Sequence, residues 1–277
     1  MTYKLLALDI DGTLVRRDGS IHSDDLQAIR RLQAAGVPVT LATGRLYSGT
    51  REVARSIGIA GPVACVDGSH IVHTEGDEHL YSRTLAGAAA AALRAILDRH
   101  EAACFLFAQD SIVHDAAGAP FSEYVRTWSP AVAVVERVSA HPYWDHEHGV
   151  HALVAVGAEA SILGAVEQIR GELATAAVVM AFPVLRVTGT YAMVVRALGP
   201  TKGTAISWLA EHHGCSPAEV VVVGDWLNDV PMFEAAGRSF AMAQAPELVK
   251  AKATDHLQAN GAHGGGVAEA IARAFSC

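Results

Sequence analysis

The stretch Leu5-Leu6-Ala7-Leu8-Asp9-Ile10-Asp11-Gly12-Thr13 is an apolar run that stops at two carboxylates. A short apolar run bounded by a turn residue is typical of a buried strand in a parallel sheet, and Gly12 lets the backbone turn sharply. Ligands of such sheets bind beyond the carboxyl ends of the strands. Asp9 and Asp11 repel one another when held together, so the pair is costly unless a cation or a shared proton stabilises it. The stretch therefore predicts a reactive site at the end of a strand.

The residues that follow alternate between helical and extended patterns. Apolar spacing predicts helices over 23–35 and 51–57, and short apolar runs predict strands over 37–42 and 63–66. The same alternation is predicted near the C-terminus, with helices over 202–213, 246–253 and 267–274 and strands over 220–223 and 240–242. We therefore predict an α/β fold with a doubly wound, Rossmann-like parallel sheet at its core.

The middle of the chain shows a different pattern of predicted helices and strands. It predicts a hairpin at 71–81, helices over 86–99 and 160–173, and strands near 104–107, 111–114, 151–156 and Leu185. This mixture suits an inserted α+β domain with an antiparallel sheet. We expect residues 1–84 and 187–277 to form the core and residues 85–186 to form an inserted cap.

The bulk properties exclude several classes of protein. The 277 residues are 51% hydrophobic and carry a formal net charge of −8, so the chain has no general basic surface for nucleic acid or anionic membranes. Its four cysteines form no CxxC pair, which favours a reducing compartment over a disulfide framework. With no signal-peptide pattern and no apolar stretch of membrane-spanning length, we expect a cytoplasmic protein.

Polar residues also follow later apolar runs. Thr43-Gly44-Arg45 comes directly after the strand predicted over 37–42, and Lys202 stands at the start of a predicted helix. A valine run ends in Asp225, with Asn228 and Asp229 close behind. Like Asp9 and Asp11, these groups thus lie at or just beyond the boundary of a predicted strand or helix.

Taken in order, these four positions resemble the four motifs of the haloacid dehalogenase superfamily. The tail, Ala241-Met242 followed by Ala245-Pro246-Glu247 and later Asn260 and Gly266-Val267-Ala268, is similar to the Cof-type group (subfamily IIB), in which a large C2-type cap lies between the second and third motifs. Asp67-Gly68-Ser69 and Ala243-Gln244 depart from that group, where Asn-Gly-Ala and Gly-Asn are commoner.

The resemblance implies a role for each acidic residue. Asp9 is expected to be the nucleophile that forms an aspartyl-phosphate, and Asp11 the general acid that then activates water. Asp9, the backbone carbonyl of Asp11 and Asp225 are expected to hold Mg²⁺, with Asp229 as an indirect ligand.

The resemblance also implies how the phosphoryl group is bound. Thr43 would donate to a phosphoryl oxygen, and Lys202 would supply positive charge that this acidic chain otherwise lacks. Backbone and side-chain contacts to the phosphate or the rest of the substrate are expected from five further residues: Ile10, Gly12, Gly44, Arg45 and Asn228.

The predicted function is Mg²⁺-dependent hydrolysis of a small phosphorylated metabolite, for example a sugar phosphate. Asp11 favours phosphate-ester chemistry, because the dehalogenases of the superfamily lack this second aspartate. A phosphomutase of the same fold and a non-catalytic sensor of phosphorylated metabolites are the two alternatives. The sequence leaves the substrate and the oligomeric state open.

Overall fold

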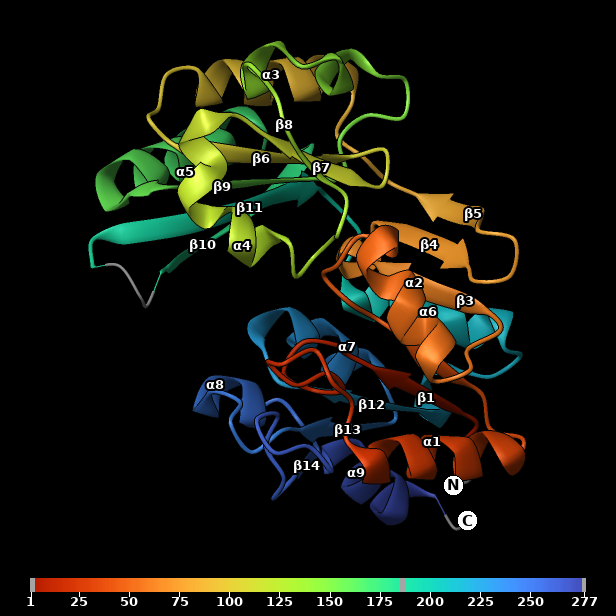
Figure 1. Ribbon diagram of the computed structural model, residues 1–277. Coiled ribbons are helices and arrows are strands. Elements are labelled where there is room, and N and C mark those ends of the chain that lie inside the picture. Colours follow the sequence, from red (N-terminus) through yellow and green to blue (C-terminus); the bar gives the residue numbers. More distant parts are fainter. Residues whose placement is uncertain (1–2, 185–187, 276–277) are drawn as a thin grey trace. The chain divides into compact units, whose positions relative to one another are not determined.

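The computed structural model describes residues 3–184 and 188–275 (Figure 1). The chain divides into two compact units, which are described separately. Unit 1 runs from Met1 to Gly44, from Thr50 to Tyr81 and from Pro200 to Cys277, and unit 2 comprises Arg45–Gly49 and Ser82–Gly199.

Unit 1 contains a parallel sheet of five strands in the order β14-β13-β12-β1-β2. The strands are β1 (Leu5–Leu8), β2 (Val39–Leu41), β12 (Val220–Gly224), β13 (Arg238–Ala241) and β14 (Asp255–His256). The helices between and beyond them are α1 (Ser23–Ala34), α6 (Lys202–His212), α7 (Val230–Ala235), α8 (Glu247–Lys250) and α9 (Gly266–Ala274). Strand order and parallel pairing confirm the predicted doubly wound α/β core.

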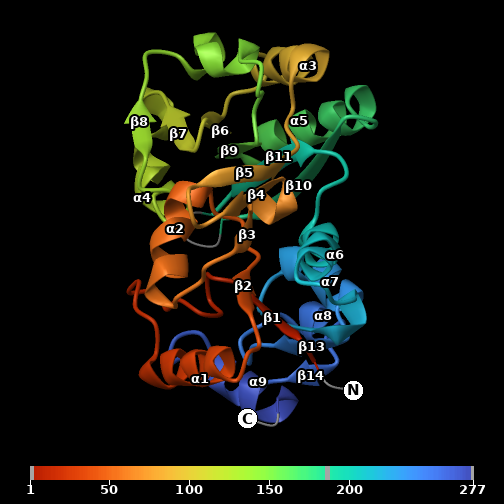
Figure 2. The same ribbon diagram turned by 90° about the vertical axis from the view of Figure 1, so that its right-hand side faces the viewer.

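Both faces of this sheet are buried, which explains why its central strands are apolar runs rather than alternating ones. All residues of β1 and the four valines of β12 are fully buried. Leu5 and Val220 belong to a hydrophobic cluster with Leu209 of α6 and Phe233 of α7. Helices α1 and α9 pack against one another on the opposite side of the sheet (Figure 2).

A side chain of α1 also holds the N-terminus of α9. The fully buried Asp25 accepts hydrogen bonds from the backbone N–H of Gly265 at 2.8 Å and of Ala268 at 2.7 Å. These N–H groups lie at a helix start, where no intrahelical acceptor is available. The first and last helices of unit 1 are thereby joined.

A smaller three-stranded sheet, in the order β3-β4-β5, extends unit 1. Its strands are β3 (Pro62–Cys65), β4 (His70–His73) and β5 (Glu78–Ser82). A single parallel bridge between Ala42 and Ala64 connects β3 to the end of β2. Helix α2 (Tyr47–Ser56) precedes β3.

Unit 2 is built on a six-stranded sheet in the order β10-β11-β9-β6-β7-β8. The strands are β6 (Ala103–Ala108), β7 (Ser111–His114), β8 (Val132–Val134), β9 (Ala152–Ala158), β10 (Ala177–Pro183) and β11 (Thr190–Ala197). The helices are α3 (Gly87–Leu97), α4 (Ser122–Val125) and α5 (Glu159–Glu172). All neighbouring strands pair antiparallel except β7 and β8. Helices α3 and α5 share one hydrophobic cluster with this sheet, so unit 2 has the mixed α+β character expected of the insert.

The boundary predicted at residue 187 was wrong, because the chain returns to unit 1 at Pro200. Strand β11 pairs along its length with β9 and β10 and so belongs to the insert. The sequence analysis predicted neither β10 nor β11. An apolar run also does not reveal which sheet its strand joins. The strand predicted near Leu185 falls outside the described residues.

At the other end of the insert the division comes after Tyr81 rather than after residue 84, and unit 2 also takes in Arg45–Gly49. In the parts of the chain that the structure describes, no helix has both the length and the apolar character needed to cross a bilayer.

Candidate active site

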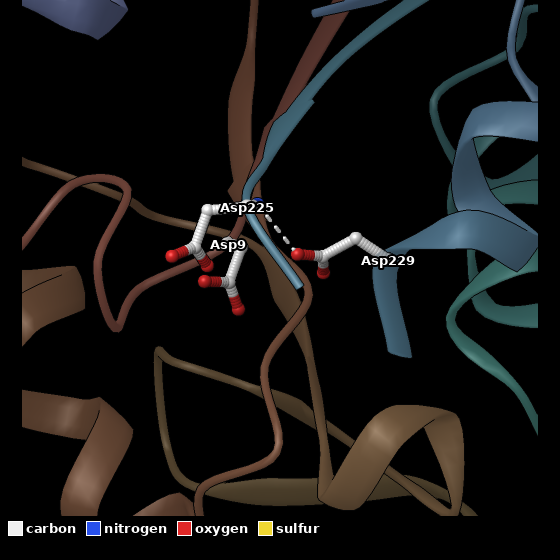
Figure 3. A group of neighbouring side chains, drawn as sticks. All are labelled: Asp9, Asp225 and Asp229. Atoms are coloured by element: carbon white, nitrogen blue, oxygen red, sulfur yellow. Dashed lines mark hydrogen bonds between the residues drawn. The ribbon is translucent and has the colours of Figure 1, made fainter. Parts of the chain in front are cut away.

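The carboxyl ends of β1 and β12 meet at one place in unit 1. Leu8 pairs with Val223 in the parallel register, and the N–H of Asp9 donates to the carbonyl of Val223 at 3.0 Å. The next residue after each strand, Asp9 on one side and Asp225 on the other, is therefore carried to the same edge of the sheet (Figure 3). Sheet register, rather than proximity in sequence, places these two carboxylates together.

Asp229 completes a group of three carboxylates with Asp9 and Asp225. Each offers one oxygen, and the three oxygens lie within 4.8 Å of one another. Asp9 and Asp229 are buried, and Asp225 is partly exposed. Three carboxylates held this close repel one another, and a donor set made only of oxygen suits a hard divalent cation such as Mg²⁺. The residues present thus fit the cation that the sequence analysis implied.

Burial raises the pKa of Asp9 well above its ordinary value, with Asp229 and Asp225 adding to the rise and Lys202 opposing it. Burial and the neighbouring charge of Asp229 raise the pKa of Asp225 to about 7, against a smaller opposing contribution from Gln244. Both shifts indicate that negative charge is unfavourable at this edge without a metal ion, even with Lys202 nearby. A bound divalent ion would reverse that preference.

Lys202 brings a positive charge into the same group. Its Nζ lies 2.5 Å from Oδ1 of Asp9 and 2.5 Å from Oδ1 of Asp229, and its side chain is fully buried. Burial alone would lower the pKa of this lysine, but the charges of Asp229 and Asp9 outweigh it and raise the pKa. Lys202 is also the first residue of α6, where the helix dipole opposes a cation. Its position is therefore maintained by the two carboxylates.

Asp229 is held by the backbone as well as by Lys202. Its Oδ2 accepts from the N–H of Asp225 at 2.8 Å and from the N–H of Trp226 at 2.9 Å, the first of which is drawn in Figure 3. Gly224 is required beside it, because a Cβ there would lie 2.5 Å from Cγ of Asp229. With Oδ1 taken by Lys202 and Oδ2 by the turn, Asp229 is arranged to support the site rather than to coordinate a metal freely.

The turn after β1 is made by backbone groups. The carbonyl of buried Ile10 accepts from the N–H groups of Thr13, Leu14 and Val15 at distances of 3.3, 3.1 and 2.8 Å. Gly12 has φ +80°, and a Cβ at this position would lie 2.4 Å from Oδ2 of Asp225. Asp11 is exposed and lies outside the three-carboxylate group.

The other predicted site residues lie beyond β2. Thr43 is almost fully buried, and its backbone N–H donates to the carbonyl of Ala64 at 2.9 Å. An added Cβ at Gly44 would lie 3.5 Å from the carboxylate of Asp67. Arg45 belongs to unit 2, where its Nη1 donates to the carbonyl of Gly49 at 3.1 Å. Its predicted contact with the substrate remains a prediction.

Asn228 is joined to Asp67, a residue that the sequence analysis noted only as a departure from the usual pattern. The Nδ2 of Asn228 donates to Oδ1 of Asp67 at 2.8 Å. Asp67 is a non-glycine residue in the left-handed region, with φ +52°, in a turn where Val66 and Gly68 also have positive φ. Such backbone strain persists only where the surroundings enforce it. Here the N–H of Asp67 donates to the carbonyl of Thr43 at 2.8 Å, and Gly68 packs against the carbonyl of Thr201.

Gln244 is a further residue of this edge that the sequence analysis did not predict to be functional. It follows β13, and its Nε2 donates to the carbonyl of Gly12 at 2.7 Å and to Oδ2 of Asp225 at 3.0 Å. The only signal in the sequence was the replacement of the commoner Gly-Asn by Ala243-Gln244.

Comparisons with known proteins identify the family of this chain. The family model of haloacid dehalogenase-like hydrolases matches residues 6–271. The chain is 23% identical over 270 residues to the pyridoxal phosphate phosphatase YbhA of Escherichia coli, covering 91% of this chain and 92% of that protein. It is 26% identical over 253 residues to an HMP-PP phosphatase of Yersinia pseudotuberculosis, covering 89% of this chain and 86% of the relative.

A solved sugar phosphatase of subclass IIB in the same superfamily has a similar fold. The two structures superpose with a TM-score of 0.76 at 22% identity, over 98% of each chain. The family match covers nearly the whole length of the chain. The chain therefore belongs to the haloacid dehalogenase-like hydrolases.

Proposed function

We propose that this protein hydrolyses a small phosphorylated metabolite in a Mg²⁺-dependent reaction that passes through a phosphorylated Asp9. The observation that carries the proposal is the position of Lys202, whose buried ammonium group joins Asp9 to Asp229 beside Asp225. A cation held against a carboxylate nucleophile neutralises charge at the point where an anionic phosphoryl group must approach.

In the first step an oxygen of Asp9 would form a bond to phosphorus as the bond to the leaving oxygen breaks. Asp11, exposed on the turn after β1, would give a proton to that leaving oxygen. In the second step the oxygen of a water molecule would attack phosphorus, Asp11 would take its proton, and the bond to Asp9 would break. The covalent route divides one slow hydrolysis into two easier steps.

The remaining residues would bind and orient. Lys202 would pair with phosphoryl oxygens, and Thr43, buried at the end of β2, would donate a hydrogen bond to one of them. Asp9, Asp225 and the carbonyl of Asp11 would hold Mg²⁺, with Asp229 supporting them through Lys202 and the turn after β12. When bound, Mg²⁺ supplies electrostatic stabilisation of the developing charge on the phosphoryl oxygens.

The substrate class is a small organic phosphate. Two named relatives act on pyridoxal phosphate and on HMP-PP, and the structural neighbour of subclass IIB acts on a sugar phosphate. The test panel for this chain therefore includes all three kinds of compound. Ranking them by kcat/KM in the presence of Mg²⁺ would identify the preferred class.

The experiment that tests the mechanism uses Asp9→Asn. This variant keeps the size of the side chain but removes the nucleophile, so hydrolysis should fall by at least about 10³-fold, while the far-ultraviolet circular dichroism stays as in wild type. Rapid quenching of wild type with substrate should trap one phosphoryl group on the peptide that contains Asp9. Full activity in Asp9→Asn would refute the covalent route, and isomerised product without free phosphate would favour a phosphomutase.

A further inference from the structure

Gln244 connects three segments of unit 1 that are far apart in sequence. Its Nε2 donates to the carbonyl of Gly12, in the turn after β1, and to Oδ2 of Asp225, after β12. Its Oε1 accepts from the N–H of Gly261 at 2.8 Å, in the loop before α9. Because only an oxygen can accept from Gly261, these contacts fix which end of the amide faces the carboxylate.

The two oxygens that share Nε2 would otherwise repel one another. The carbonyl of Gly12 and the carboxylate of Asp225 are both acceptors, and the amide of Gln244 is the donor between them. Space around them is small: an added Cβ at Gly12 would lie 2.4 Å from Oδ2 of Asp225, and one at Gly261 would lie 2.1 Å from the carbonyl of Gly12. The turn, the carboxylate and the loop therefore approach one another closely beside Gln244.

We propose that Gln244 is a positioning residue, which binds Oδ2 of Asp225 and so fixes the orientation in which this carboxylate receives Mg²⁺. A carboxylate on a single methylene rotates readily, and ordering it before the metal arrives reduces the entropic cost of binding. Groups that hydrogen-bond to metal ligands commonly control affinity in this way. The inference rests on the proposed function, because it assumes that Asp225 is a Mg²⁺ ligand.

The test is Gln244→Met, which preserves side-chain length while removing both hydrogen-bonding groups. Titration calorimetry with MgCl₂ should show binding weakened by about tenfold relative to wild type. The Mg²⁺ concentration for half-maximal activity should rise by a similar factor, whereas KM for the phosphate ester at saturating Mg²⁺ should stay within about threefold. A residue that merely supported the fold would lower the unfolding midpoint without moving the Mg²⁺ affinity.

Gln33→Met is the matched control. Gln33 lies on α1 in the same unit, and its Nε2 donates to the carbonyl of Ile57 at 3.0 Å, away from the carboxylate group. The Gln33→Met variant should lose a comparable hydrogen bond and keep the Mg²⁺ affinity of wild type. If Gln244→Met does not fold, Gln244→Asn makes the same comparison, because its amide is one methylene too short to keep all three contacts.

The outcomes separate the two proposals. If the wild-type protein hydrolyses phosphate esters with Mg²⁺ and a folded Gln244 variant keeps the Mg²⁺ affinity of wild type, this inference alone is overturned. A wild-type protein that neither binds Mg²⁺ nor hydrolyses any ester overturns the proposed function, and the inference with it.

Discussion

The Nζ of Lys202 lies 2.5 Å from Oδ1 of Asp9, although 193 positions separate the two residues in the chain. Both side chains are buried, so their attraction is screened far less than that of a surface pair. The same ammonium group also contacts Asp229. Part of the negative charge at this site is therefore balanced by one lysine that the fold brings to the end of the first strand.

Lys202→Met tests that balance. The variant leaves two buried carboxylates without their cation, so the free energy of unfolding at neutral pH should fall by about 3–5 kcal/mol and kcat by at least about 10²-fold. Urea unfolding and steady-state kinetics measure the two effects. Lys252→Met is the matched control, since Lys252 pairs with Glu234 on the surface and should cost less than about 1 kcal/mol. Equal effects of the two variants would contradict the role assigned to Lys202.

Gly12→Ala tests the close approach of the first turn to Asp225. An alanine there has to adopt φ near +80° and place its Cβ 2.4 Å from the carboxylate. We expect a loss of stability of about 1–3 kcal/mol together with weakened Mg²⁺ binding. Gly19→Ala separates strain from collision, because Gly19 has φ +83° with open space around it. Gly19→Ala should lose stability and keep its activity.

Asp67 and Asn228 should act as a pair. An ionised carboxylate only accepts hydrogen bonds, so Asp67 fixes the amide of Asn228 with its nitrogen toward the carboxylate. The amide introduced by Asp67→Asn can donate as well as accept a hydrogen bond, so it no longer fixes the orientation of the Asn228 amide. A double-mutant cycle with Asn228→Ala, measured on kcat/KM, should give a coupling of about 0.5–3 kcal/mol. Additive effects of the two substitutions would show that the contact does not serve catalysis.

Asp255 should make stability depend on pH. Hydrogen bonds from Arg238 at 2.9 and 3.0 Å are the main cause of its lowered pKa, and Arg273 donates to the same carboxylate at 2.7 Å. A carboxylate with a lowered pKa stabilises the fold above its unfolded value of 3.8, and this contribution is lost as pH falls through the folded value.

Asp255→Asn should therefore cost about 1.5–3 kcal/mol near neutral pH, and the cost should shrink in acid. Urea unfolding of wild type and variant, from neutral pH down to below the ordinary carboxyl pKa of 3.8, gives the difference in the free energy of unfolding. Glu52→Gln is the control, since the pair of Glu52 with Arg55 is well exposed and should contribute almost nothing. A cost that stays constant with pH would rule out the assigned ionisation.

Much of unit 1 could be predicted because its signals are local. The four consecutive valines that begin β12, the apolar run before Asp9 and the helical spacing after Ser23 each identify an element without knowledge of the rest of the chain. Strand β11 could not be assigned in the same way. Its partners lie 8–20 residues away in β10 and 32–44 residues away in β9, so its sequence alone suited either unit.

The sequence by itself determined which residues could do the chemistry: two aspartates at a strand end, a lysine at a helix start and two more aspartates after a valine run. Their order along the chain was enough to indicate the family. The tertiary structure decided how they are used. Only the parallel register of β1 with β12 brings Asp9 to Asp225, and only the turn after β13 lets Gln244 reach both Asp225 and the carbonyl of Gly12. Residue identity sets what each group can donate or accept, whereas hydrogen bonding and charge pairing act over a few ångströms and so depend on where the fold places those groups.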